Sequence, residues 1–183
     1  MIRPRRILTS LLAALAFGAI ALGASSCGYS SDSKDVVEGE PVTLEGVQYN
    51  VVFSRFLNPS DTEDSAYLVG QAPALPGRNY FGVFFEVQND GDSAKKLPGS
   101  FSITDAEHQS YESIPSESLY AFPLEGEVEA EEQIPILDST PQEGPIEGSL
   151  VLFLLPETAS ENRPLTLQIV GPKGGLAEVT LDL

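Results

Sequence analysis

The sequence predicts an all-β protein: an antiparallel immunoglobulin-like β-sandwich that follows a signal peptide and a flexible linker. Through most of the chain apolar residues alternate with polar ones at a period of two, which is typical of strands with one buried face. The 14 prolines and 16 glycines interrupt the chain at short intervals. No segment after the signal carries a sustained helical stripe. Short strands joined by turns around one core favour a sandwich over a closed barrel.

The first 26 residues have the parts of a secretory signal. Arg3, Arg5 and Arg6 form a basic start, and an apolar stretch follows over residues 7–22. This stretch is shorter than a membrane span and leads into small residues. We therefore expect residues 1–26 to be a lipoprotein signal peptide. The general secretory route is the simpler one, although adjacent arginines also occur in twin-arginine signals.

Cys27 is the sole cysteine and directly follows those small residues. The pattern resembles a bacterial lipobox, although Ala24 stands where a larger aliphatic residue is usual. We expect Cys27 to carry the lipid that holds the protein on the extracytoplasmic face of the cell membrane. The alternative is an incidental thiol in a secreted protein. Residues 27–41 are small and polar, which predicts a flexible linker before a domain at 42–183.

Alternation and turn residues place the strands of this domain. We expect residues 150–155, six apolar residues in a row, to be covered on both faces, and 81–88 to have one buried face. The segments 55–79 and 113–147 are rich in proline and acidic residues, and we expect extended loops there. The predicted strands are 47–54, 81–88, 95–97, 100–104, 110–112, 150–155, 165–169 and 179–183.

Several of these signals occur in a familiar order. A strand ends in Gln88-Asn89-Asp90-Gly91-Asp92, Phe101-Ser102-Ile103-Thr104-Asp105 leads to His108-Gln109-Ser110-Tyr111, and Gly148 to Pro156 forms a late strand. The chain thus resembles a family of bacterial exported and lipoprotein domains of unknown function with an immunoglobulin-like sandwich, related to secreted actinobacterial immunoprotective antigens. The turn before His108 lacks that family's usual glycine, and residues 138–147 look inserted. The resemblance implies a fold and an extracytoplasmic setting, and transfers no site residue.

Charge and composition exclude several classes of function. Cleavage after residue 26 removes three of the ten basic residues and none of the 27 acidic ones, which changes the formal charge from −17 to −20. Nucleic acid is then a poor partner, because its phosphates need a basic surface. His108 is the sole imidazole, so a transition-metal or structural zinc site lacks its usual ligands. We expect no cofactor, and a membrane contact made only through the lipid.

An acidic segment, residues 125–132, is a candidate for calcium. Glu125, Glu127 and Glu129 alternate along an extended backbone, and calcium prefers oxygen ligands. The alternative is a solvated acidic edge, which deters pairing between sheets. His108 has no nucleophile elbow or glycine-flanked serine to accompany it, so we expect no catalytic activity.

Aromatic residues occur in or beside the two predicted loop regions. Exposed aromatics near arginine are typical of protein-binding surfaces. The alternative is that these rings fold back and fill the ends of the sandwich. The candidates for partner binding are Arg55, Phe56, Tyr67, Tyr120 and Phe122.

Two functions follow from these observations. The first is a lipid-anchored binding or accessory module of the cell envelope, without catalytic activity, that contacts an envelope protein or ligand through its loops. The second is a calcium-binding surface protein that uses residues 125–132.

Overall fold

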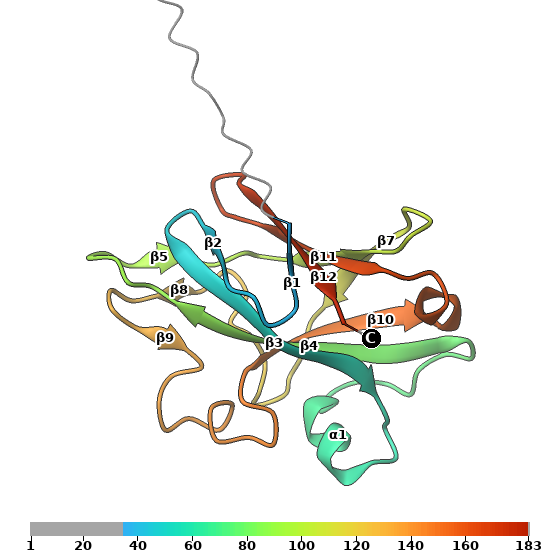
Figure 1. The fold of residues 1–183 in the computed structure, drawn as a ribbon. Coiled ribbons are helices and arrows are strands. Elements are labelled where there is room, and N and C mark those ends of the chain that lie inside the picture. The colour runs from blue at the N-terminus through green and yellow to red at the C-terminus, as the bar shows by residue number, and fades with distance from the viewer. Residues whose placement is uncertain (1–34, 183) are drawn as a thin grey trace, which may run out of the picture. The chain divides into compact units, whose positions relative to one another are not determined.

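The computed structural model describes residues 35–182, and the signal peptide and Cys27 lie outside them. The described chain is a β-sandwich, as the sequence predicts (Figure 1). Its elements are β1 (Asp35–Val37), β2 (Val42–Leu44), β3 (Val47–Leu57), α1 (Thr62–Tyr67), β4 (Arg78–Gln88), β5 (Lys95–Lys96), β6 (Phe101–Thr104), β7 (Ser110–Ile114), β8 (Glu127–Val128), β9 (Gln133–Ile134), β10 (Ser149–Pro156), the 3-10 helix η1 (Glu157–Ser160), β11 (Leu165–Val170) and β12 (Leu176–Leu181).

The strands form two layers that are joined through β7. The order is β1-β12-β11-β6-β7-β10-β4-β3-β2, with β9 also paired to β4, and β5 and β8 form a separate pair. The first half of β7 pairs with β6 in one layer, and Ser113 and Ile114 pair with β10 in the other. All strand pairs are antiparallel except β1 with β12. In Figure 1, β11 and β12 lie on one side of the β3-β4-β10 layer and α1 lies on the other.

The main core fills the space between the layers. Alternate residues of β4 point into it, among them Phe81, Val83 and Phe85, which are fully buried. Phe85 contacts Phe101 of β6, with ring centroids 5.0 Å apart, and Phe122, at 5.7 Å. This inner face is what period-two alternation predicts.

The opposite face of β4 is also buried at Tyr80, Gly82 and Phe84, which corrects the prediction of one buried face there, whereas Glu86 and Gln88 on the same face are exposed. Phe84 has no exposed surface, and Leu150, opposite it on β10, and Leu152, opposite Gly82, are 1% exposed. A second apolar cluster lies here, formed with Leu57 and Tyr67. Both faces of β10 are covered, as predicted. We use the name outer layer for the side chains on this face of β4 and β10 together with α1 and the loops that cover them. It is distinct from the two strand layers of the sandwich.

Two further predictions need correction. The segment 55–79 holds the end of β3, the helix α1 and the start of β4, and the segment 113–147 holds β8 and β9. The linker expected at 27–41 contains β1, which pairs in parallel with residues 178–180 of β12. Among residues 35–182, no helix is both long and apolar enough to cross a membrane.

A carboxylate fastens the turn after β1 to the sandwich. The turn is bound next to a bulge of strand β3, which lies between Val51 and Phe53 where the pairing with β4 shifts. Glu38 accepts hydrogen bonds from the Ser54 N–H (2.9 Å), the Ser54 hydroxyl (2.5 Å) and the Asp182 N–H (3.1 Å). The turn is therefore bound both to β3 and to the chain after β12.

Candidate functional site

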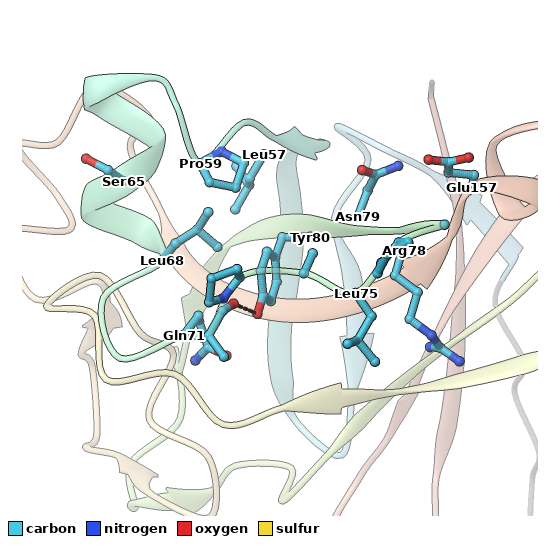
Figure 2. A pocket seen from close by; sticks show the side chains of 15 residues that line it. Leu57, Pro59, Ser65, Leu68, Gln71, Leu75, Arg78, Asn79, Tyr80 and Glu157 are labelled. Carbon is cyan, nitrogen blue, oxygen red and sulfur yellow. Dashed lines mark hydrogen bonds between the residues drawn. The ribbon is translucent and has the colours of Figure 1, made fainter.

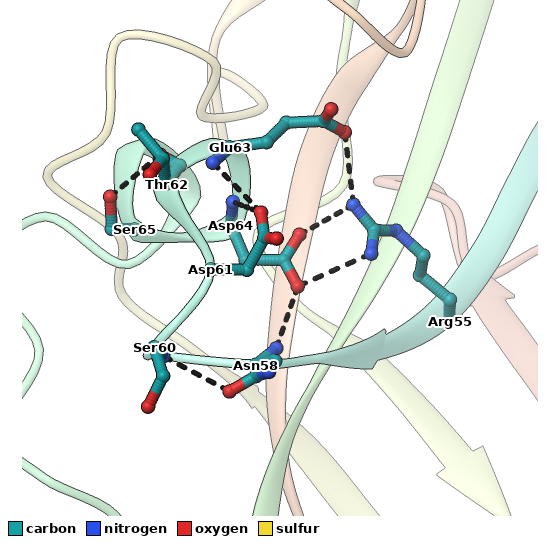
Figure 3. Close-up of polar contacts among 8 residues, drawn as sticks. All are labelled: Arg55, Asn58, Ser60, Asp61, Thr62, Glu63, Asp64 and Ser65. Atoms are coloured by element: carbon teal, nitrogen blue, oxygen red, sulfur yellow. Dashed lines mark hydrogen bonds and ion pairs between the residues drawn. The ribbon is translucent and has the colours of Figure 1, made fainter.

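The short helix α1 is held on the sheet by an ion pair between a buried carboxylate and a partly exposed arginine (Figure 3). Asp64 is 1% exposed, and its carboxylate accepts two hydrogen bonds from Arg55 of β3, at 2.5 and 3.2 Å, and one from the Asn58 N–H at 2.7 Å. Arg55 also pairs with Glu63 at 3.1 Å. Asp61 caps the helix by accepting from the backbone N–H groups of its first turn. A buried carboxylate with these partners fixes the helix position.

The segment 113–122 completes the cover over the outer face. The Ser118 hydroxyl donates to the Ala66 carbonyl at 2.8 Å, and the Gln71 side chain donates to the Pro115 carbonyl at 2.9 Å. Tyr67 lies between two rings, with its centroid 5.0 Å from Phe84 and 4.8 Å from Tyr120. These contacts join three segments that are distant in sequence into one layer.

A pocket of about 590 Å³ opens where α1 ends (Figure 2). Its lining residues, which we call the loop pocket, are Leu57, Pro59, Ser65, Leu68, residues 71–80 and Glu157. Leu57, Leu68 and Tyr80 form buried walls, and Leu75 is 67% exposed. The Tyr80 hydroxyl donates to the Ala72 carbonyl at 2.6 Å, which fixes the proline-rich loop over the strand.

The lining of the loop pocket suits binding more than chemistry. Its walls are mostly leucine, proline and alanine, and its charged residues are Arg78 and Glu157. The pocket lies within the volume range of small-ligand sites, which are largely apolar with a few polar groups. A partner would therefore be held by apolar contact and oriented by the two charges.

The five residues predicted to bind a partner do not form one exposed surface. Tyr67 and Phe122 are 0% and 5% exposed, so neither is available for contact in this structure, and Tyr120 is half-buried against Tyr67. Phe56 packs edge-on against Phe81 at 5.0 Å, and Arg55 is used by α1. The alternative, in which loop aromatics fold back onto the sandwich, describes these rings.

The acidic segment is solvated but is extended only at β8, because Glu125 and Glu131 lie in turns with φ values of 59° and 60°. Glu125, Glu127 and Glu129 are all exposed, Glu125 lies against Gly99, and Glu127 is opposite Lys96 in the β5–β8 pair. Within the described part of the chain, no three Asp, Glu, His or Cys side chains come together in a way that could hold a metal ion. The geometry therefore does not favour the calcium interpretation.

His108 belongs to a structural turn centred on Asp105. Asp105 accepts from the N–H groups of Glu107 and Gln109 and from the Tyr111 hydroxyl, each at 2.9 Å. Burial alone raises the pKa of Asp105, but the hydrogen bonds outweigh it and the pKa lies below its ordinary value. His108 has a φ of 61°, the left-handed conformation for which the missing glycine is usual.

Sequence reasoning missed the loop pocket and the helix beside it. One signal was present: Asp61 followed by Thr62, Glu63 and Asp64 is a helix start with acidic residues in its first turn. The six-residue helix is too short to show a period. The pocket walls come from β3, β4, α1 and η1, and no local pattern relates them.

Comparisons with known proteins support the fold. No family model matches the chain, and no curated protein matches it. An uncharacterized β-sandwich protein from Clostridium difficile 630 matches with a TM-score of 0.50 and 14% identity, over 81% of this chain and 93% of its own. The yjhA protein from Bacillus subtilis matches with a TM-score of 0.56 and 14% identity, over 80% of this chain and 99% of its own. At such identities the likeness shows one thing, that the chain shares a β-sandwich fold with these bacterial proteins.

Proposed function

We propose that this protein is a binding or accessory module of the cell envelope, without catalytic activity, and that it contacts an envelope protein or ligand through the loop pocket. The single observation that carries the proposal is the pocket itself, about 590 Å³ in volume and walled by apolar side chains on a fixed support. Leu75 at its mouth is 67% exposed and offers apolar surface to a partner.

The envelope setting rests on the sequence. The basic start, the apolar stretch and Cys27 support a lipid anchor, and the formal charge of −20 after cleavage keeps the domain off an anionic membrane. The predicted family of exported immunoglobulin-like domains agrees with this setting. Intact-mass analysis of the protein from its host membrane tests the anchor: we expect a chain that begins at Cys27 with added acyl groups.

Site-directed crosslinking in the host membrane tests the pocket. A photo-reactive amino acid at position 79, on the rim, should capture a partner in the wild type. Leu75→Glu should abolish that product, because it places a charge on the apolar wall. Leu137→Glu is the matched control, since Leu137 is 64% exposed and lies outside the pocket. A product that survives Leu75→Glu, or that both variants abolish, would overturn the proposal.

A further inference from the structure

A second, polar hollow of about 220 Å³ lies on the outer face of the same sheet, at the other end of β4. It is lined by side chains from β3, β4 and β9. We call it the amide pocket, after its five polar residues, Gln48, Asn50, Glu86, Gln88 and Gln133.

Strand register brings these five residues together. Gln48 of β3 is opposite Gln88 of β4, and Gln88 is opposite Gln133 of β9. Asn50 is opposite Glu86, two residues along the same strands. Opposite residues, and those two apart, share a face of the sheet. Strand pairing therefore builds the polar lining, and no mobile loop is needed to assemble it.

The hydrogen bonds of the amide pocket occupy one N–H of three carboxamides and leave their carbonyl oxygens unused. The Asn50 NH₂ donates to Glu86 at 3.2 Å, the Gln88 NH₂ to Asp90 at 2.7 Å, and the Gln133 NH₂ to the Pro135 carbonyl at 3.3 Å. Each amide therefore keeps its carbonyl oxygen as an acceptor. Each NH₂ also keeps a second N–H, so the amides can accept or donate, and it is the Glu86 carboxylate, which only accepts, that favours a ligand that donates hydrogen bonds.

Asn50 carries an acceptor without a partner. Its Oδ1 atom is buried and has no hydrogen bond within the described chain. A buried acceptor in this state is unfavourable. The carboxamide can turn about its soft terminal torsion and present the oxygen to the pocket, and this turn gives up the hydrogen bond from its NH₂ to Glu86. A donor that enters the pocket would then be shared between Asn50 and Glu86.

Charge narrows the class of donor to a small cation. Glu86 is the one charged residue in the lining, and the surrounding chain is strongly acidic. A single carboxylate with amide oxygens matches a primary ammonium, which has one charge and three donors. A calcium ion usually takes more carboxylates. Pro41 and Ile134 give the pocket an apolar side along which methylene groups can lie.

We infer that the amide pocket binds an aliphatic primary ammonium group, with its N–H donors on Glu86 and Asn50 and its methylene chain against Pro41 and Ile134. The same chemistry is offered by a free aliphatic diamine and by a lysine side chain of another protein. The inference does not rest on the function proposed for the loop pocket.

Nuclear magnetic resonance of the full-length protein in a neutral detergent tests the inference, because side-chain NH₂ signals report directly on the amide pocket. The probes are cadaverine, Nα-acetyl-lysine methylamide and the uncharged 1-pentanol. We expect saturable shifts of the Asn50, Gln88 and Gln133 NH₂ signals with one or both amines, and none with 1-pentanol. Shifts of the NH₂ signals with cadaverine alone would indicate that the natural ligand is a free diamine. Shifts with the lysine derivative would indicate that it is a lysine side chain of another protein.

Two variants with the same change of charge make the test specific. Glu86→Gln should weaken amine binding at least tenfold, because it removes the charge-assisted partner. Glu132→Gln removes an exposed charge outside the pocket and should change binding less than twofold. The inference fails if neither amine shifts the NH₂ signals, if 1-pentanol shifts them equally, or if both variants weaken binding alike.

Discussion

Both faces of β4 are buried from Tyr80 to Phe85, yet different kinds of structure cover them. The inner face packs against strands of the opposite layer, and Phe85 meets Phe101 there. The outer face is covered by α1 and the segment 113–122, and Phe84 meets Tyr67. Packed strands build the inner core, whereas a smaller apolar cluster and a few polar contacts hold the outer layer on the sheet. We therefore expect the inner core to unfold with the whole domain and the outer layer to open separately.

The largest effect is expected from a cavity in the inner core. Phe85→Ala should lower the free energy of unfolding by about 3–5 kcal/mol, because it removes a fully buried ring from a packed cluster. Urea denaturation followed by circular dichroism measures this. Phe53→Ala is the control, since Phe53 is 43% exposed, and it should cost less than about 1 kcal/mol. Equal losses in the two variants would contradict the assignment of the core.

The outer layer should respond to loss of its ion pair. Arg55→Met leaves the Asp64 carboxylate buried with fewer partners, and we expect a loss of about 1–3 kcal/mol. Hydrogen exchange should accelerate at the backbone N–H groups of Ser65 and Leu68 while β4 stays protected. Arg78→Met, at an exposed arginine with one long hydrogen bond of 3.4 Å, serves as the control. Uniform acceleration of exchange across the domain would show that the outer layer and the inner core unfold as one cooperative unit.

The free energy of unfolding should also depend on pH through Asp105, in the turn between β6 and β7. The folded pKa of Asp105 lies below its ordinary value, so the carboxylate stabilises the fold above that ordinary value and loses its contribution as the pH falls through the folded pKa. Asp105→Asn should therefore cost about 1 kcal/mol at neutral pH, and the difference from wild type should shrink below about pH 4. Urea denaturation of the wild type and the variant at neutral pH and below about pH 4 measures this difference in the free energy of unfolding. A difference that is constant with pH would contradict the role of the charge.

The smallest effect is expected from calcium. Ligands that bind the folded state raise the melting temperature, and the glutamates of residues 125–132 do not converge. Millimolar calcium should therefore leave the melting temperature unchanged in both wild type and Glu127→Gln. A rise in the wild type that Glu127→Gln abolishes would restore calcium binding as a function.

Sequence alternation predicted the inner face of the sandwich well. Val47 to Val51, Phe81 to Val87 and Leu165 to Ile169 alternate because one face of each strand contacts the main core, and each lies in a strand of the structure. The prediction was wrong at Phe53, which is 43% exposed because the bulge after Val51 shifts the register of β3. The outer face of β4 was not predicted. Phe84 has the same apolar character as its neighbours, and what covers it lies in segments that carry no period.

Long-range contacts also explain the remaining errors. Strand β1 has only two valines to mark it, and its partner in β12 is about 140 residues away in sequence, so a polar context favoured a linker. Among the candidate site residues, Tyr67 and Phe122 were chosen for their place in predicted loops. Their burial depends on Phe84 and Phe85, which no local pattern connects to them.

The place where β1 meets the sandwich has a mechanical consequence. A force applied to β1 at Asp35 would be transmitted to β12 through the hydrogen bonds between residues 35–37 and 178–180. The hydrogen bonds between Glu38 and Ser54 would transmit part of this force to β3. Tension along β1 would stretch several hydrogen bonds at once, so the junction should resist shear better than a simple loop attachment. The outer layer, with its pocket, lies off this line of force and can keep its shape while the chain is under strain.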